Sequence, residues 1–335
     1  MEYLTLGKTG LRVSRLGFGG IPIQRADAGK ARELVLAMKD AGVNYIDSAR
    51  GYTVSEAYIG EALEGVRDSF ILATKSMART REAMAADIET SLRNFRTGYI
   101  DLYQVHNPND AALDQVIGEG GALEALLEAK EAGKIGHIGL TAHSKAVAMR
   151  ALDLPWVETV MFPFNIVEDQ GRDVIEKAKE KNAGFIAMKP LAGGAIESGR
   201  TALRFLAKER GVDLIIPGMA ELGELRENIA AVSDPAPYSP EEEAEADAIR
   251  SSLGSGFCRR CNYCAPCTAG ISIPNVFLFE GYLERYGLEE WARSRYATLA
   301  KKASDCVGCG VCESRCPYEL PIRAMMQRAR KAFGE

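Results

Sequence analysis

At 335 residues with 47% hydrophobic content, the chain is long enough to bury one large core and a smaller second one. Its formal net charge of -5 gives no electrostatic reason to expect a nucleic-acid partner. No apolar run approaches the ~18 residues that a membrane span requires, and the first residues lack the apolar segment of a signal peptide. These properties predict a cytoplasmic protein that binds neither nucleic acid nor a membrane.

Residues 1–232 read as a hairpin followed by alternating strands and helices. Gly7 and Gly10 lie between apolar residues near the start, which predicts the hairpin. Strands are expected at 16–19, 43–46, 70–74, 100–105, 135–141, 159–164, 185–188 and 214–216, with a helix after each. Eight such units in roughly 220 residues match a (β/α)8 TIM barrel. An open doubly wound sheet is the alternative, but residues 16–20 lack the G-x-G-x-x-G that it normally carries.

Three of these strands end at an ionisable residue: Asp47, Lys75 and His106. The ends of parallel barrel strands meet at one rim, and a short loop after the first of the three brings Tyr52 there. A tyrosine is a poor acid at neutral pH unless a cation stabilises its phenolate, and Lys75 can supply that charge while Asp47 holds it. His106 can donate a hydrogen bond to a carbonyl oxygen. The set predicts a general acid aimed at a carbonyl group that receives a hydride.

The composition changes between residues 233 and 256, where prolines and acidic residues gather. Ser239 is placed as the N-cap of a helix with Pro240 at its first position. This stretch is therefore predicted to be a linker containing a connecting helix, between a barrel domain at 1–232 and a small domain at 257–335.

All eight cysteines lie in the small domain, in two runs of four. The second run has the spacing C-x2-C-x2-C-x3-C-P, which is the bacterial ferredoxin pattern for [4Fe–4S] ligation. In that pattern the fourth cysteine of each run reaches the other cluster. The expected ligand sets are Cys258, Cys261, Cys264 and Cys316 for one cluster, and Cys306, Cys309, Cys312 and Cys267 for the other.

The first run departs from the pattern, since only two residues precede Cys267 and Thr268 stands where a proline is usual. A long insert, predicted to be helical at 277–299, also separates the runs. Structural zinc is the alternative, because C-x2-C pairs also bind Zn2+. The prediction is a mainly α-helical, ferredoxin-like domain with two [4Fe–4S] clusters.

The sequence resembles the aldo-keto reductases. The matching signatures are Asp47-Ser48-Ala49 through Tyr52, then Ser55-Glu56 and Gly60, then Ala73-Thr74-Lys75, and then the run from Asp101 to His106. The cysteine domain resembles that of a subgroup with a C-terminal ferredoxin-like domain. The resemblance implies a catalytic tetrad of Tyr52, Lys75, Asp47 and His106, and hydride transfer between NADPH or NADH and a small carbonyl or alcohol substrate.

A nucleotide site is expected in the loops after the seventh and eighth strands, where barrel enzymes often bind phosphate. The resemblance implies that the Glu227-Asn228 pair binds the adenine of the nucleotide. It also implies that positions 218, 219 and 224 face the 2'-phosphate of NADP. Because Glu224 would repel a phosphate, the sequence leans toward NADH. The nicotinamide positions are occupied by Thr141, Met161 and Met188, with Asn165, Lys189 and His143 as further candidates. The implied contacts are Thr141, Met161, Met188, Lys189, Leu191, Gly193, Gly194, Pro217, Gly218, Met219, Glu227 and Asn228.

The role of the clusters stays open at this stage. Hydride carries two electrons and a cluster normally accepts one, and the sequence offers no clear flavin site. Electron relay to a redox protein partner, redox sensing and structural support are the three alternatives. A different class of function is a non-catalytic barrel that serves as the docking subunit of an electron-transfer assembly.

Overall fold

The computed structural model describes residues 1–254 and 256–335, which form two compact units. The first unit comprises Met1–Asn165, Asp169–Pro190 and Ser198–Tyr238, and the second comprises Ile166–Glu168, Leu191–Glu197 and Ser239–Glu335. Two short segments that interrupt the barrel sequence therefore belong to the compact unit that carries the cysteines. Ser255, within the predicted linker, lies outside the described residues.

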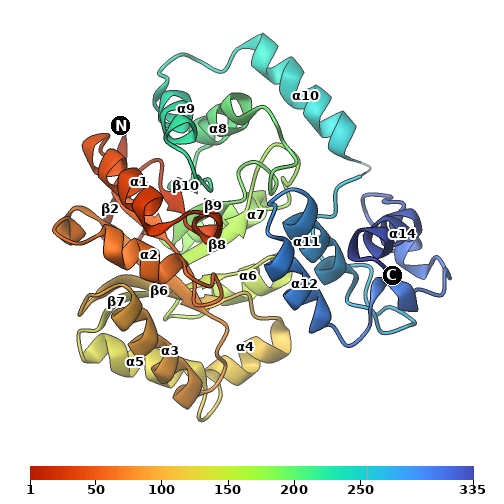
Figure 1. Cartoon of the computed structure of the whole chain (residues 1–335), viewed down its shortest axis with the longest axis horizontal. Helices are drawn as coiled ribbons and strands as arrows, with labels where there is room; N and C mark the ends of the chain where they lie inside the picture. Colours follow the sequence, from red (N-terminus) through yellow and green to blue (C-terminus); the bar gives the residue numbers. More distant parts are fainter. Residues whose placement is uncertain (255) are drawn as a thin grey trace. The chain divides into compact units, whose positions relative to one another are not determined.

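The first unit is the predicted parallel barrel (Figure 1). Its strands are paired in chain order: β3 (Phe18–Gly19), β4 (Tyr45–Asp47), β5 (Ile71–Ser76), β6 (Ile100–His106), β7 (Ile135–Thr141), β8 (Thr159–Pro163), β9 (Gly184–Met188) and β10 (Leu214–Ile216). Parallel bridges from Leu16 to Ile215 and from Gly19 to Gly218 join the last strand to the first. These bridges bring the sheet almost to full closure.

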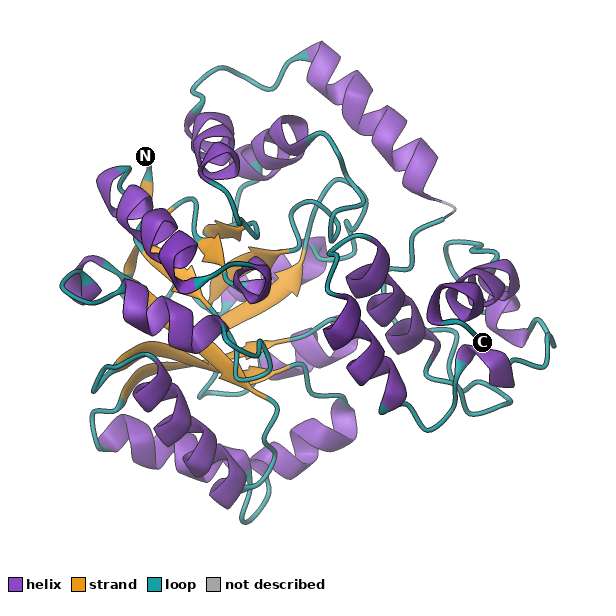
Figure 2. Ribbon diagram, viewed as in Figure 1, coloured by secondary structure: helices purple, strands orange, loops and turns teal. Residues whose placement is uncertain are grey.

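Helices of the first unit surround its strands, as Figure 2 shows. The predicted helices are α1 (Ala28–Asp40), α2 (Ser55–Ala62), α3 (Arg81–Asn94), α5 (Ala122–Glu131), α6 (Lys145–Ala151), α7 (Arg172–Glu180), α8 (Gly199–Lys208) and α9 (Leu222–Ser233). Helix α4 (Asp110–Ile117) was not expected from the sequence. Its N-cap is Asn109, whose side chain accepts a hydrogen bond from the N–H of Ala112 at 2.8 Å.

The predicted N-terminal hairpin is present as β1 (Tyr3–Thr5) paired antiparallel with β2 (Arg12–Ser14). Leu6 and Val13 are fully buried in one hydrophobic cluster with residues of the barrel strands. A side chain at Gly184 would lie 2.6 Å from Cγ of Leu6, so the hairpin packs tightly against the start of β9. The hairpin thus covers the amino-terminal end of the strands, and Asp47, Lys75 and His106 lie toward the opposite end.

The second unit is mainly helical and contains α10 (Pro240–Gly254), α11 (Ile273–Glu284), α12 (Glu289–Ala297), α13 (Val311–Ser314) and α14 (Ile322–Phe333). The side chain of Ser239 accepts a hydrogen bond from the N–H of Glu242 at 3.2 Å, so the predicted N-cap of α10 is confirmed. The insert between the cysteine runs is helical as predicted, as α11 and α12. No helix among the described residues is both long and apolar enough to cross a membrane.

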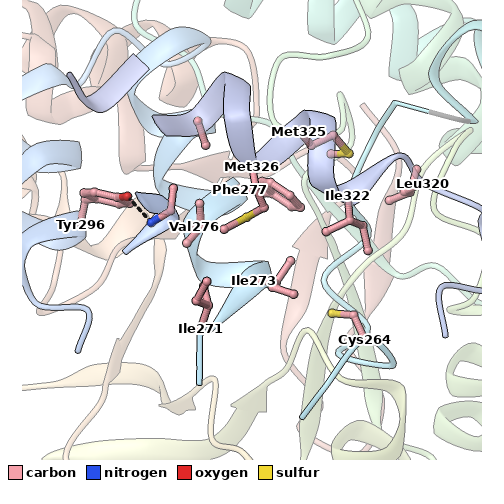
Figure 3. Packing of buried hydrophobic residues seen from close by; sticks show 12 residues of the cluster. Cys264, Ile271, Ile273, Val276, Phe277, Tyr296, Leu320, Ile322, Met325 and Met326 are labelled. Carbon is pink, nitrogen blue, oxygen red and sulfur yellow. Dashed lines mark hydrogen bonds between the residues drawn. The ribbon is translucent and has the colours of Figure 1, made fainter. Parts of the chain in front are cut away.

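The core of the second unit lies between α11 and α14 (Figure 3). Val276 and Phe277 from α11 pack there with Met325 and Met326 from α14. Tyr296 closes one side: its hydroxyl accepts the N–H of Ala303 at 2.7 Å. Cys264 is itself a member of this core, so the cysteine runs and the helices bury apolar surface together.

Candidate active site and cysteine pockets

The four predicted catalytic residues lie together at the carboxyl ends of neighbouring strands. Asp47 ends β4, Lys75 lies near the end of β5 and His106 ends β6. Tyr52 is in the loop that leads from β4 into α2. The loop is held in place by backbone bonds from the N–H of Tyr52 to Ala49 O, at 3.0 Å, and from the N–H of Ser55 to Tyr52 O, at 2.8 Å.

The contacts among these four residues follow the chemistry expected of them. The ammonium of Lys75 forms a buried ion pair with Asp47 and donates a second hydrogen bond to the carbonyl of Ser48 at 2.7 Å. The same nitrogen lies 4.8 Å from the centroid of the Tyr52 ring. The ring of His106 stands edge-on to that of Tyr52, with 6.2 Å between centroids. A fixed positive charge and an imidazole therefore flank one phenol.

Burial acts on both members of the ion pair. It raises the pKa of Asp47 and lowers the pKa of Lys75, while their mutual attraction works against both shifts. Gln104, which is fully buried in β6, donates from Nε2 to the second carboxylate oxygen of Asp47 at 3.0 Å. That hydrogen bond favours the charged form of Asp47 and fixes its orientation. The sequence analysis assigned no role to Gln104; the available signal was a polar residue within an apolar strand.

A buried carboxylate anchors the helix that follows Tyr52. Glu56, in the first turn of α2, accepts hydrogen bonds from Thr74 and Ser91, each at 2.8 Å, and from Asn94 at 3.0 Å. It also pairs with Arg50. These contacts join α2 to β5 and α3, so the loop that carries Tyr52 begins and ends on rigid elements.

Several of the predicted nicotinamide contacts lie on adjacent strands at the same rim. Thr141 ends β7 and is paired in register with Met161 of β8, and Met188 ends β9. Thr141 Oγ1 accepts the N–H of Asn107 at 3.0 Å, which leaves its hydroxyl hydrogen to donate. The carbonyl of Lys189 accepts a hydrogen bond from Asn165 Nδ2 at 2.9 Å.

The predicted adenine and phosphate positions of the first unit lie after β10. Pro217 and Gly218 follow the strand directly, and Glu227 and Asn228 lie in α9. Met219 is fully buried. Glu224 accepts hydrogen bonds from the N–H groups of Ala220, at 2.6 Å, and Glu221, at 3.0 Å, as the cap of α9.

Three predicted contacts, Leu191, Gly193 and Gly194, lie in the second unit. There the carbonyl of Gly193 accepts a hydrogen bond from Nε of Arg285 at 3.0 Å. Arg285 follows the last residue of α11, and the sequence analysis gave it no role. The predicted glycine loop thus contacts the end of α11 within the second unit.

The eight cysteines line two separate pockets of the second unit. One pocket contains Cys258, Cys261, Cys264 and Cys316. The other contains Cys267, Cys306, Cys309 and Cys312. Each pocket combines three cysteines of one run with the last cysteine of the other, which is the grouping that the ferredoxin pattern predicts.

The thiol groups fit iron–sulfur clusters in number and chemistry. Burial raises the pKa of Cys258 to about 11 and that of Cys264 to about 12, so thiolates in this pocket require a compensating cation such as iron. In the described part of the chain, no three His, Cys, Asp or Glu side chains surround a single point as a one-ion site requires. The four cysteines of each pocket line a common cavity.

Both parts of the chain match models of known protein families. A model described as the aldo/keto reductase family matches residues 15–201, and a model described as a 4Fe-4S dicluster domain matches residues 257–321. L-galactose dehydrogenase of Arabidopsis thaliana is 25% identical over 302 residues, covering 74% of this chain and 94% of that protein. The aldo-keto reductase YhdN of Bacillus subtilis is 29% identical over 221 residues, covering 60% of this chain and 65% of its own length.

Solved structures of other proteins are similar in fold to this chain. A putative aldo-keto reductase from Pseudomonas aeruginosa superposes with a TM-score of 0.62 at 29% identity, covering 69% of this chain and 94% of its own. An aldo-keto reductase from Bacillus halodurans, in its holo form, gives a TM-score of 0.64 at 24% identity, covering 74% and 96%. The second likeness bears on the fold alone.

Proposed function

Because the chain belongs to the aldo/keto reductase family and is an oxidoreductase of that type, we propose that it transfers a hydride between NAD(P)H and a small carbonyl or alcohol substrate. The observation that carries this proposal is the position of the Lys75 ammonium, which lies 4.8 Å from the centroid of the Tyr52 ring and is paired with Asp47. A phenol beside a fixed cation has the chemistry of a general acid.

Bound NAD(P)H supplies the hydride that reaches the carbonyl carbon. Tyr52 donates its hydroxyl proton to the carbonyl oxygen, and Lys75 stabilises the phenolate that remains. Asp47 keeps Lys75 charged and in place. His106 donates a hydrogen bond that orients the same oxygen. In the direction of alcohol oxidation, the phenolate of Tyr52 accepts the hydroxyl proton.

The cofactor proposal rests on residues after the last strands. Thr141 retains a hydroxyl hydrogen for the nicotinamide amide, and the partly buried Met188 offers apolar surface beside it. Met161, also a proposed contact, lies in the hydrophobic core of the barrel. Glu224 carries a negative charge at a position where the 2'-phosphate of NADPH needs a cation, which favours NADH. Leu191, Gly193, Gly194, Pro217, Gly218, Glu227 and Asn228 are the remaining proposed contacts.

For the second unit we propose two [4Fe–4S] clusters, one in each cysteine pocket. Most of the cysteines pack against the hydrophobic core of that unit, which supports a structural contribution from the clusters. Electron relay to a redox protein partner and redox sensing are both compatible with that contribution. Anaerobic addition of NADH followed by visible spectroscopy tests the relay, because bleaching of the iron–sulfur absorbance requires electron transfer into the clusters. Unchanged absorbance despite nucleotide binding would favour structural support or sensing.

The test of the catalytic proposal is Tyr52→Phe in the cluster-replete protein. This variant should lose carbonyl reduction while it retains the affinity of the wild type for NADH and NADPH. Tyr58→Phe, in α2, is the matched control and should keep wild-type turnover. Retained turnover in Tyr52→Phe would contradict the assignment of the acid.

A further inference from the structure

Arg79 holds its guanidinium group at the barrel rim, between two strands that carry proposed catalytic residues. Strand β5 ends at Ser76, which is paired with Val105 of β6. The carbonyl of His106 lies one residue beyond this last pair, and it accepts a hydrogen bond from Nη2 of Arg79 at 2.7 Å. The guanidinium therefore takes the place that a further residue of β5 would occupy, between the ends of the strands that carry Lys75 and His106.

The backbone around Arg79 is fixed by the segment that precedes α5. The carbonyl of Arg79 accepts the N–H of Ala122 at 3.0 Å, and Thr80 forms an antiparallel bridge with Gly121. Thr80 is also the N-cap of α3, where its side chain accepts the N–H of Ala83 at 3.4 Å. A ligand of the guanidinium would therefore meet a group whose backbone is already ordered, which lowers the entropic cost of binding.

The charge of Arg79 has no acidic partner. Its Nη1 donates to the carbonyl of Ala78 at 3.3 Å, so both acceptors of the side chain are neutral backbone groups. No carboxylate of residues 1–254 or 256–335 forms an ion pair with it, whereas the nearby Lys75 is paired with Asp47. Burial lowers the pKa of Arg79 and no neighbouring carboxylate offsets that shift, although an arginine remains protonated at neutral pH.

The position of this unpaired charge identifies the group that it would bind. Tyr52 and His106, the proposed donors to the substrate carbonyl, lie at the same rim, so a substrate held by them lies beside the guanidinium. One positive charge balances one negative charge, and the remaining N–H groups of a planar guanidinium match the two oxygens of a carboxylate. We propose that Arg79 binds a carboxylate of the substrate, so that the active site selects carbonyl compounds that carry a carboxylate group. This inference names a substrate class for the proposed hydride transfer and rests on that proposal.

The test is the steady-state kinetics of the cluster-replete protein with matched pairs of aldehydes at saturating nucleotide. Para-carboxybenzaldehyde is compared with benzaldehyde, and succinic semialdehyde with butanal. The wild type should have the lower KM for the carboxylated member of at least one pair, and added salt should raise that KM alone. Arg79→Gln should raise the same KM about 10- to 100-fold, the range expected for loss of a charge-assisted hydrogen-bonding group. Its kcat and its KM for the neutral aldehyde should stay close to the wild-type values.

Two further variants serve as controls. Arg79→Lys keeps the charge but loses the planar arrangement of donors, so it should recover part of the affinity for the carboxylated aldehyde. Arg81→Gln changes an exposed arginine in the first turn of α3, which pairs with Glu128 at 2.9 Å, and it should leave both KM values unchanged.

Two results would overturn the inference and leave the proposed hydride transfer standing. One is a wild type that reduces the neutral aldehydes with KM values no higher than those for their carboxylated counterparts. The other is an Arg79→Gln variant whose KM is unchanged, or rises equally for carboxylated and neutral aldehydes, which would mean that Arg79 only holds the strand ends together. A wild type that reduces none of these aldehydes would instead count against the hydride transfer itself, and against the inference with it.

Discussion

The hydroxyl oxygen of Thr268 lies 3.1 Å from Sγ of Cys309. Thr268 directly follows the last cysteine of the first run, at the position where the ferredoxin pattern usually has a proline. Cys309 belongs to the second run and to the pocket that Cys267 completes. The hydrogen bond from Thr268 lowers the pKa of Cys309 and so favours its thiolate. The departure from the sequence pattern thus places a hydrogen-bond donor on a proposed cluster ligand.

We expect Thr268→Val to lower the reduction potential of the cluster in that pocket. A hydrogen bond to a ligand sulfur stabilises the more negative, reduced cluster, and valine removes the donor while keeping the shape of the side chain. Thr268→Ser should retain the wild-type potential. Redox titration followed by electron paramagnetic resonance measures both. Equal potentials in the valine and serine variants would show that the hydroxyl has no influence on the cluster.

The grouping of cysteines predicts which double variants lose one cluster and which lose two. Cys264→Ser and Cys316→Ser affect the same pocket, so each should remove about four iron atoms per chain and the pair together no more. Cys264→Ser combined with Cys306→Ser should remove about eight. Iron and sulfide analysis of anaerobically purified protein gives the numbers. A loss of about eight iron atoms in the Cys264–Cys316 pair would contradict the crossover.

The barrel and the meeting of Asp47, Lys75 and His106 were predictable because both depend on local sequence. Each strand is a short apolar run, and its last residues lie at the common rim whatever the details of packing. The cysteine grouping was predictable for a similar reason, since the ligand spacing within each run is itself the signal. The additional helix α4 was missed, although Asn109 supplies an N-cap.

Contacts between distant residues could not be predicted in the same way. Gln104 contacts Asp47 across 57 positions of sequence, and Arg285 contacts Gly193 across 92. No periodicity or spacing encodes such pairs. The burial of Met219 could not be predicted either: its side chain is completely buried, and its contact with the nucleotide stays a prediction. Which way a loop residue points depends on packing that a single sequence does not reveal.

Gln104→Met should lower kcat about 10- to 100-fold with little change in KM. Methionine fills a similar volume but cannot donate to Asp47, so one oxygen of this buried carboxylate loses the hydrogen bond from Gln104. The pKa of Asp47 then rises further and its hold on Lys75 weakens, while the substrate pocket keeps its shape. Steady-state kinetics with saturating nucleotide separates the two parameters. A rise in KM at constant kcat would assign Gln104 to substrate binding instead.

Glu158 should make stability depend on pH in the acid range. Burial raises its pKa, but hydrogen bonds from His137, Lys130 and the N–H of Ile138 outweigh that effect and lower the pKa to about 2 from the ordinary 4.5. A carboxyl group whose pKa is depressed in the folded state stabilises that state above its unfolded pKa. The stabilisation is then lost as the pH falls from about 4.5 to about 2. Solvent screening at this partly accessible site limits the contribution to about 1–2 kcal/mol at neutral pH.

Glu158→Gln should therefore lower the free energy of unfolding of the barrel by that amount at about pH 7, and by less than half of it at about pH 3. Trp156 lies in the first unit and Trp291 in the second, so urea unfolding followed by fluorescence in a Trp291→Phe background reports on the barrel alone. Glu89→Gln, which removes an exposed ion pair with Lys134, is the control and should change stability by less than ~1 kcal/mol at either pH. An equal loss in Glu158→Gln at both pH values would mean that the side chain acts through packing and not through its charge.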